Sequence, residues 1–321
     1  MNYWPNRFEA TPPAKKEEGA YIDWPEKVAG MKKRLRSEKF KEHFNQAQLF
    51  YNSLSEPEKM HLTAALGFEL DHCEDPLVYN RMSQRLADIS LELAQSVAEL
   101  VGGEVPQKEG RPNHGKTAKG LSQTEFPPRA PTIESRRIAI IIADGYDPVA
   151  YNGMVAAIKA AKALPFTIAP RRSKIYAAGE SKETGKGVQP DHHLEGMRST
   201  MFDSIFVPGG ADSVTTLRKN GRALHWVREA YGHLKAIGAV GEAVELIKDA
   251  CSLPGMEFST SSEVQDSYGV VTAAQVTPNS FKETLEMAKG AKDFVDAYTF
   301  EISQHKNFER ELKGFPMMVA F

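Results

Sequence analysis

The sequence is short of cysteine, of long apolar runs and of net charge, and each shortage excludes a class of protein. Its 321 residues hold two cysteines, Cys73 and Cys251, which cannot form a framework of several disulfides and lack the spacing of metal ligands. No apolar run approaches the roughly 20 residues of a membrane span. The net charge of −2 gives no general attraction to nucleic acid or to acidic membranes. We therefore expect neither as a partner.

We expect no secretory signal in the opening residues. The opening, MNYWPNRFEATPP, has neither a basic start nor an apolar core. It is similar to the interior of a longer chain, so the sequence leaves the localisation unknown, with secreted and cytoplasmic both open.

Two kinds of segment make up the first third of the chain. Residues 1–24 mix isolated aromatics with proline and charge, which fits an extended arm on another surface or a disordered terminus equally well. Residues 25–101 are predicted to be helical, with Ser55 and Glu58 in the pattern of a capping box. Between residues 78 and 100 apolar side chains recur every three or four positions, which predicts one buried helical stripe.

The remaining two thirds comprise a linker and an α/β region. Residues 102–135 are rich in glycine, proline, lysine and serine, a composition that predicts a linker, able to lie ordered across a partner surface. From residue 136 to residue 321, buried strands alternate with helices, which is typical of a doubly wound parallel sheet. The expected strands fall within residues 138–143, 166–170, 201–210, 235–240 and 267–273, and a closing helix is expected over 279–300.

An open parallel sheet binds its ligands at the carboxyl ends of its strands. The segments FDSIFVPGG, residues 202–210, and AIGAVGEAV, residues 236–244, resemble the PfpI-type superfamily, which has the flavodoxin-like fold of class I glutamine amidotransferases. In that family a cysteine at a strand-to-helix turn is activated by a nearby acid, and the PGG loop offers amides to an oxyanion.

Carried onto this sequence, the resemblance implies a site without its chemistry. The nucleophile position falls on Gly238 and the acid position near Ala150, with Asp147 in the same loop. Nothing at these positions can form a thiolate, so no catalytic residue is expected. The expected vestigial elbow and crevice comprise Gly238, Ala150, Asp147, Pro208, Gly209 and Gly210.

Two other groups of polar residues were weighed as metal sites. His192 and His193 follow Asp191, but adjacent side chains on a strand point apart, so an exposed loop is favoured over a metal site. Asp144 and Asp147 could hold a cation, although two aspartates alone are weak support for one. We expect no metal in this chain.

Two motifs in the first third resemble the haem catalase family. NYWPNRF, residues 2–8, resembles the motif of that family's wrapping arm, and QLFYNSLSEPEK, residues 48–59, resembles the signature of its helical domain. The signature is carried by Leu49, Phe50, Tyr51, Ser53, Glu58 and Lys59. EAYGHLKAIGAVGEA, residues 229–243, is similar to the PfpI-like domain that large-subunit catalases append.

The resemblance implies a domain order and a missing part. It assigns residues 1–24 to the wrapping arm, 25–101 to the helical domain, 102–135 to the linker and 136–321 to the PfpI-like domain. The family's haem barrel, with its tyrosine ligand, would precede the arm and does not occur in this sequence. We therefore expect the carboxy-terminal part of a large-subunit catalase, with no cofactor of its own and haem in the parent chain.

The function implied is non-catalytic. The parent would disproportionate hydrogen peroxide to water and oxygen, and this portion would serve stability and assembly. A homo-oligomer is expected, with a tetramer for the parent and a dimer as the possible assembly of this portion. The alternatives are a chaperone-like module that holds unfolded proteins, a small-molecule or anion pocket at the PGG loop, and an active PfpI-type hydrolase.

Overall fold

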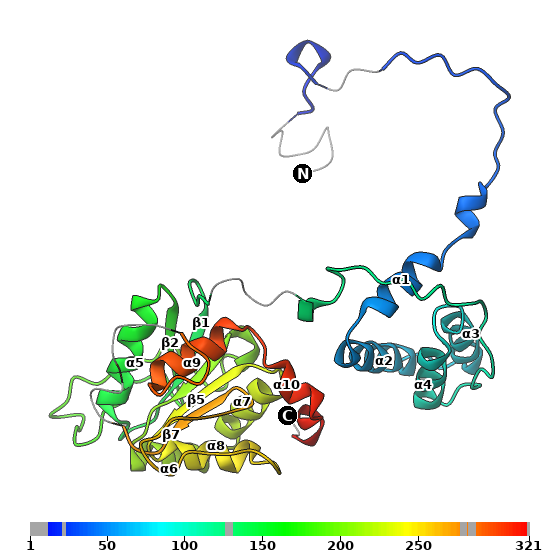
Figure 1. Ribbon diagram of the computed structural model, residues 1–321. Helices are drawn as coiled ribbons and strands as arrows, with labels where there is room; N and C mark the ends of the chain where they lie inside the picture. The colour runs from blue at the N-terminus through cyan, green and yellow to red at the C-terminus, as the bar shows by residue number, and fades with distance from the viewer. Residues whose placement is uncertain (1–11, 21–23, 126–130, 277–280, 282–286, 320–321) are drawn as a thin grey trace. The chain divides into compact units, whose positions relative to one another are not determined.

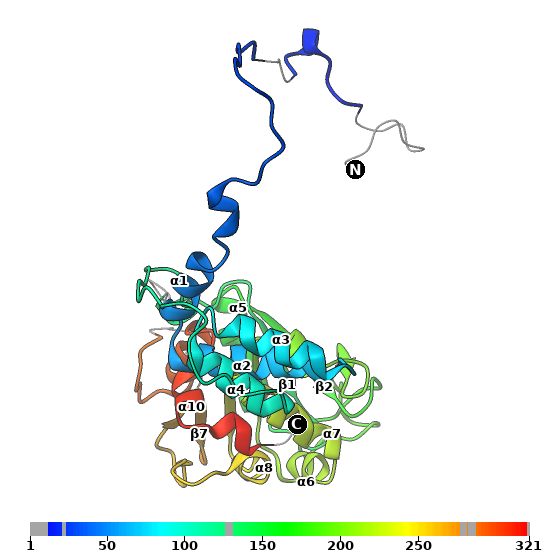
Figure 2. The same cartoon turned by 90° about the vertical axis from the view of Figure 1, so that its right-hand side faces the viewer.

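The computed structural model describes residues 12–20, 24–125, 131–276, 281 and 287–319. The chain divides into two units, residues 1–43 and residues 44–321, and each is described by itself. In the first unit the described backbone is extended apart from two 3-10 turns, Lys16–Glu18 and Glu38–Lys41 (Figures 1 and 2). Its apolar side chains Trp24, Val28, Met31 and Leu35 are exposed. The motif NYWPNRF lies outside the described residues.

The helical region contains four α-helices. They are α1 (Asn45–Ser53), α2 (Glu56–Asp71), α3 (Pro76–Leu86) and α4 (Leu91–Val101). The α-helices begin later than residue 25, because the described residues between 25 and 44 contain only the 3-10 turn Glu38–Lys41. The capping box at the start of α2 is confirmed: the Ser55 N–H donates to Glu58 Oε2 at 2.8 Å.

The single helical stripe predicted between residues 78 and 100 was wrong, because two helices share it. The chain leaves helical geometry after α3, and the Ser90 hydroxyl accepts from the Leu93 N–H to begin α4. Leu86, Leu93 and Val97 are buried in the core of this region, whereas Leu100 at the end of α4 is 58% exposed. The apolar periodicity identifies the core residues correctly. It does not reveal the Ser90 cap, at which the predicted single helix is divided into α3 and α4.

The segment that follows α4 lies along the same helices. Asn113 and Asn52 exchange amide hydrogen bonds of 2.8 and 3.0 Å, and the Ala118 N–H donates to Ser53 Oγ. The Gln123 N–H donates to Glu58 Oε1 at 2.7 Å. Residues 102–125 are therefore an ordered strap on α1 and α2, and the polar composition that predicted a linker supplies the hydrogen bonds.

The second part of the chain forms a seven-stranded sheet of order β3-β2-β1-β4-β5-β7-β6. In the described residues every neighbouring pair is parallel except β6 with β7. The strands are β1 (Arg137–Ile141), β2 (Leu164–Ala169), β3 (His192–His193), β4 (Ser204–Val207), β5 (Ala236–Val240), β6 (Gln265–Ser267) and β7 (Val270–Ala273). The prediction of an α/β parallel sheet is confirmed.

Helices cover both faces of this sheet (Figure 1). They are α5 (Pro148–Ala160), α6 (Ala211–Arg218), α7 (Gly221–Gly232), α8 (Ala243–Cys251), α9 (Phe294–Ser303) and the short α10 (Phe308–Leu312). One apolar core joins the sheet to α6, α7 and α8, and the other joins it to α5 and α9. Because both faces are buried, the central strands are continuous apolar runs, which is why the sequence revealed them.

Two short strands and the closing helix departed from expectation. β3 has two residues and β6 has three, too few for a periodic signal, and neither was predicted. The closing helix was expected from residue 279, but in the described residues it begins at Phe294, where Asp293 accepts from the Val295 N–H. Residues 279, 280 and 282–286 of that prediction lie outside the described residues.

One fully buried guanidinium joins three elements of the α/β region. Arg310 donates to the carbonyl oxygen of Tyr268 in the β6–β7 turn and to that of Tyr231 in α7, at 2.5 and 2.8 Å. It also donates to Lys235 O before β5 and lies over the Tyr231 ring, with 4.1 Å between Cζ and the ring centroid. Carbonyl oxygens and an aromatic face thus replace the water that a charged group would otherwise need.

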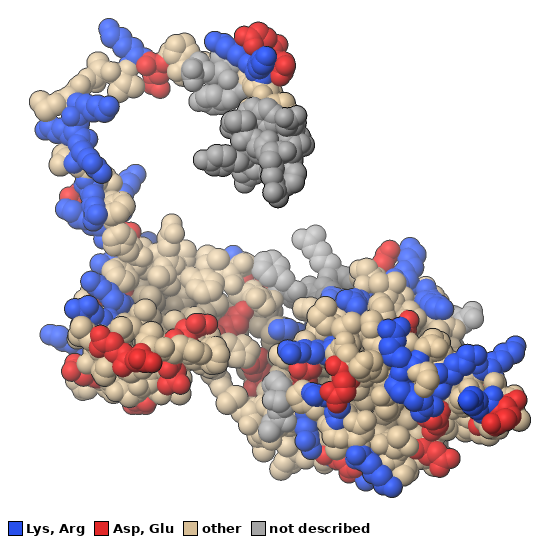
Figure 3. Space-filling model, turned by 180° about the vertical axis from the view of Figure 1, so that it is seen from behind, with Lys and Arg blue, Asp and Glu red and all other residues tan. Residues whose placement is uncertain are grey.

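Surface charge and helix length bear on possible partners. On the face shown in Figure 3, Lys and Arg side chains of residues 44–321 are interspersed with Asp and Glu. Among the described residues, no helix has both the length and the apolar composition needed to cross a membrane.

Replacing the buried guanidinium should strongly destabilise the α/β region. Arg310→Met keeps much of the volume but removes the Arg310 donors from the buried Tyr268 carbonyl oxygen and the charged hydrogen bond to the Tyr231 carbonyl oxygen, so we expect a loss of about 3–5 kcal/mol. Urea denaturation measures it. The matched control is Arg218→Met, which removes an exposed ion pair with Asp249 and should cost far less. Equal losses of stability in the two variants would contradict the stabilising role of the Arg310 contacts.

Candidate functional site

The structure brings together the loops that follow β1 and β4. The Asp147 N–H donates to Gly209 O at 2.9 Å. Gly210 lies against this loop so closely that a Cβ there would collide with the Gly145 carbonyl oxygen, and its φ of 108° also favours glycine. The expected convergence at the carboxyl edge of the sheet is therefore present. The two loops pack backbone against backbone.

Gly238 does not lie at the turn, and that expectation was wrong. It is inside β5, paired with Phe206 on β4 and Val271 on β7. A Cβ at Gly238 would lie 2.8 Å from the ring of Tyr298 on α9, so glycine makes room for that ring. The turn between β5 and α8 is formed by Gly241, whose φ is +60°. An apolar run that continues to Val240 is the sequence signal for this longer strand.

The residue after the turn occupies the amide that was expected to bind an oxyanion. The Gly210 N–H donates to Glu242 Oε2 at 2.9 Å. A helix-linked carboxylate of the chain itself thus stands where a developing negative charge would be stabilised. With glycine at the turn and a carboxylate on this amide, the edge has neither a nucleophile nor a free Gly210 donor.

The acid candidates in the first loop are committed to structure. Asp147 caps α5, and its Oδ1 accepts from the Val149 and Ala150 N–H groups at 2.8 and 3.3 Å. Ala150 is fully buried in the first turn of that helix. Neither is placed to activate a nucleophile.

Asp144 forms a two-point ion pair with Arg171, with contacts of 2.7 and 2.9 Å. Partial burial disfavours the charged carboxylate, but Arg171 and the Tyr176 N–H outweigh it and hold the pKa of Asp144 below its ordinary value. A guanidinium therefore takes the place that a cation would need.

The histidine pair lies on an edge strand. His192 and His193 form β3, and the His192 ring stacks on Phe166 with centroids 6.2 Å apart. Asp191 accepts from the Thr167 N–H at 2.7 Å. The described residues contain no group of three or more His, Cys, Asp or Glu side chains that could hold a metal ion. The exposed loop expected here is a partly buried strand.

Both cysteines are free thiols, and only Cys251 is buried. Cys251 is buried at the end of α8, where burial raises the pKa of its thiol to about 12. Its Sγ donates to the Ile247 carbonyl oxygen. Cys73 is partly exposed and forms no disulfide. A thiolate at Cys251 is strongly disfavoured.

Five buried tyrosines do not fit a haem ligand. Ligation through oxygen requires a phenolate, but burial raises the pKa of Tyr51, Tyr151, Tyr231 and Tyr298, and that of Tyr146 to about 12. Three of their hydroxyls also contact the protein: Tyr298 with Ser204, Tyr151 with Thr167, and Tyr231 with Met256. We therefore derive no step through haem on these residues.

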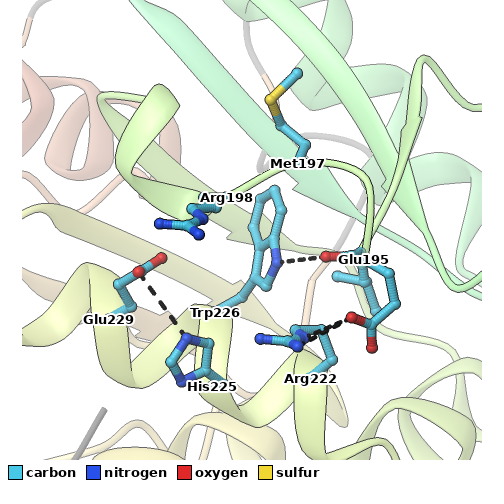
Figure 4. Close-up of a pocket in the computed structure, with 8 residues that line it drawn as sticks. Glu195, Met197, Arg198, Arg222, His225, Trp226 and Glu229 are labelled. Carbon is cyan, nitrogen blue, oxygen red and sulfur yellow. Dashed lines mark hydrogen bonds and ion pairs between the residues drawn. The ribbon is translucent and has the colours of Figure 1, made fainter.

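We call the carboxyl edge of the sheet the closed edge, because the loop contacts and Glu242 fill it. Away from it, a cavity of about 280 Å³ lies between α7 and the segment after β3 (Figure 4). Its charges are largely paired: Arg222 with Glu195 at 3.0 Å, and His225 Nε2 with Glu229 Oε1 at 3.9 Å. Trp226 donates from Nε1 to Leu194 O at 3.1 Å, which fixes the cavity floor. This near balance of charge gives no preference for an anion or a cation.

Two carboxyl groups, those of Asp266 on β6 and Glu301 on α9, lie close together. Asp266 Oδ1 is buried without a hydrogen-bond partner, and Glu301 Oε2 accepts from Asn307 Nδ2 at 3.1 Å. Burial, followed by the proximity of Glu301, raises the pKa of Asp266 from 3.8 to about 7. Below about pH 7 the folded chain therefore favours a protonated Asp266 carboxyl.

Two family models match the sequence. The model described as "Catalase-related immune-responsive" matches residues 37–101, and the model described as "C-terminal domain found in long catalases" matches residues 134–295. The second covers half of the chain. The chain belongs to the family of long-catalase C-terminal domains. The resemblance to catalases drawn from the sequence motifs is thereby confirmed.

Curated relatives extend the match to the whole chain. Catalase-1 of Neurospora crassa is 60% identical over 321 residues, which are all of this chain and 43% of that protein. Catalase A of Aspergillus fumigatus is 55% identical over 330 residues, all of this chain and 44% of that protein. The Catalase of Alkalihalophilus pseudofirmus is 31% identical over 287 residues, 89% of this chain and 39% of that protein. The chain thus spans less than half of the length of each of these relatives.

Adding a methyl group at Gly238 should destabilise the fold. Gly238→Ala forces its Cβ against the Tyr298 ring in a closed core, and we expect a loss of about 1–3 kcal/mol in thermal or urea unfolding. Gly221→Ala is the matched control, because a Cβ there meets no atom within 4 Å. A Gly238→Ala variant as stable as the control would contradict the assigned position.

The raised pKa of Asp266 should make the stability of the fold depend on pH. Because the folded pKa of Asp266 lies above its ordinary value, its contribution is present below about pH 4 and is lost as pH rises through about 7. In the wild-type chain this effect should lower the free energy of unfolding by on the order of 3 kcal/mol between pH 4 and pH 8, and Asp266→Asn should abolish that decrease in denaturation curves. Asp249→Asn, in an exposed ion pair, is the control. If the free energy of unfolding of Asp266→Asn depends on pH as that of the wild-type chain does, the raised pKa assigned to Asp266 is wrong.

Proposed function

We propose that this chain acts as the non-catalytic carboxy-terminal portion of a large-subunit catalase and contributes stability and assembly. The observation that carries the proposal is the closed carboxyl edge of the sheet. Gly241 provides no nucleophile there, and the Glu242 carboxylate takes the Gly210 amide. The fold therefore persists without the chemistry that its turn serves in PfpI-type enzymes.

The finer fold assignment is a PfpI-type, flavodoxin-like domain. Its support is the order of the parallel strands β2-β1-β4-β5-β7, which is the order 2-1-3-4-5 of flavodoxin-like sheets. The turn after β5, followed at once by α8, and the glycine loop after β4 agree with the same type. The boundaries 1–24, 25–101, 102–135 and 136–321 remain predictions.

For the parent protein we propose haem-dependent disproportionation of hydrogen peroxide in a homo-oligomer. The names of the relatives support peroxide chemistry. When bound, haem would supply the redox steps, and the described residues of this chain would only support the part that holds it. The exposed Trp24, Val28, Met31 and Leu35 of the first unit suit an arm that is buried against another surface in such an assembly.

Among the alternatives, a PfpI-type hydrolase and an anion pocket at the PGG loop are opposed by Gly241 and Glu242. A chaperone-like role has partial support from apolar side chains exposed on the helical region, including Phe68 at 65% and Met60 at 57%. If this role operates, the chain at equimolar ratio should suppress the light scattering of a heat-denatured client protein. Unchanged scattering would exclude it.

The chain itself should not turn over peroxide. With added haemin and hydrogen peroxide we expect oxygen evolution no faster than with haemin alone, and no tyrosinate-type Soret band, because burial opposes a phenolate at the five buried tyrosines. An oxygen electrode and an absorbance spectrum suffice. Rapid turnover would refute the non-catalytic role.

The stabilising role is tested in a long relative. Deleting from Neurospora Catalase-1 the region that matches residues 134–295 should lower the unfolding temperature or the oligomeric state, while turnover per bound haem is retained. Unchanged stability and assembly after the deletion would contradict the proposed role.

A further inference from the structure

A cavity of about 240 Å³ lies at the amino edge of the sheet, opposite the closed edge. Asp203 and Lys235 immediately precede β4 and β5, and His305 and Lys306 follow α9. Its lining is Thr200, Asp203, His233, Lys235, His305 and Lys306. Four of the six side chains are basic, in contrast to the nearly balanced cavity of Figure 4.

Neither lysine of this cavity has a carboxylate partner among the described residues. The Lys235 ammonium is partly buried and donates to the carbonyl oxygens of Ser199 and Phe202 at 3.0 and 2.6 Å. The Lys306 ammonium has no hydrogen-bonded or ion-paired partner in the described part of the chain. Two positive charges thus share the cavity without direct neutralisation.

The contact with Arg136 leaves the Nε2–H group of His305 as its hydrogen-bond donor. Arg136 Nη1 lies 2.9 Å from His305 Nδ1, and a guanidinium can only donate, so Nδ1 accepts and the ring hydrogen is on Nε2. His305 has a φ of +70°, a left-handed conformation that is uncommon for residues with a side chain. Thr200 adds a hydroxyl to the lining.

The acidic groups that face the cavity are already engaged. Asp203 accepts from Arg136 Nη1 at 3.1 Å and from the Arg137 N–H at 2.8 Å. Glu229, near Lys235, accepts from the N–H and the hydroxyl of Ser199. Glu311 adds a more distant negative charge near Lys306. The oxygens of Asp203 and Glu229 are therefore turned to other donors, and the positive potential of the cavity is only partly compensated.

The basic groups also disfavour each other's charge. Burial and then Lys235 lower the pKa of His233, while burial and then Arg136 lower that of His305. Burial, opposed by Asp203 and Glu229 and assisted by Lys306, lowers the pKa of Lys235 to about 8. A bound negative charge would reverse each of these shifts.

We propose that this amino-edge cavity binds a small, doubly charged oxyanion such as sulfate or inorganic phosphate. Ammonium, imidazole N–H and hydroxyl groups are the donors that such ions take. The volume is below the range of about 300–1,000 Å³ of sites for drug-sized ligands, so the occupant is the ion rather than a larger ester. The site is independent of the catalase-related role.

Binding is tested on the intact chain with sodium sulfate, against sodium chloride at equal ionic strength. Isothermal titration calorimetry or the unfolding temperature should show a saturable response to sulfate alone. Lys306→Ala should weaken sulfate binding about ten- to hundredfold, the value of one charged hydrogen bond. Lys219→Ala, an exposed lysine outside the cavity, is the matched control and should leave the affinity unchanged.

A second variant and a pH series keep the test independent of folding. His305→Asn retains a residue that tolerates the left-handed backbone and should weaken binding severalfold. Sulfate keeps its charge between pH 6 and 8, so its affinity should rise as pH falls, because His233 and Lys235 take up protons on binding. No saturable response, equal losses in Lys306→Ala and Lys219→Ala, or an affinity independent of pH would overturn the site.

Discussion

Burial of the parallel sheet on both faces is the constraint from which the rest of the α/β region follows. Every residue of β5 is buried, so a side chain at Gly238 would have to displace the Tyr298 ring. The same burial confines polar chemistry to the two edges of the sheet or to groups that satisfy each other. Arg310 is of the second kind, since it is fully buried and surrounded by carbonyl oxygens.

The two edges of the sheet have opposite character. At the carboxyl edge, backbone contacts and the Glu242 carboxylate fill the space between the loops. At the amino edge, Lys235 and Lys306 face a cavity without direct neutralisation. The usual ligand crevice of an open parallel sheet lies at the carboxyl ends of its strands, so this domain keeps the architecture while its free charge lies at the other end.

The sequence predicted most of the architecture because buried strands and capped helices have strong local signals. The runs that become β1, β4 and β5 and the capping box of α2 are of this kind. Strands of two or three residues carry no periodicity, so β3 and β6 depend on their neighbours. The site was harder to predict, because only the sheet register distinguishes Gly238, inside β5, from Gly241 at the turn.

Membership in the long-catalase family and the filled carboxyl edge of the sheet are the two findings that support the proposed non-catalytic role. The most direct test is the backbone amide resonance of Gly210 during a titration with formate, a small carboxylate that competes for an oxyanion site. Because Glu242 occupies this amide, the resonance should not move in the wild-type chain and should shift saturably in Glu242→Ala. A saturable shift in the wild-type chain would show an open anion site and contradict the closed edge.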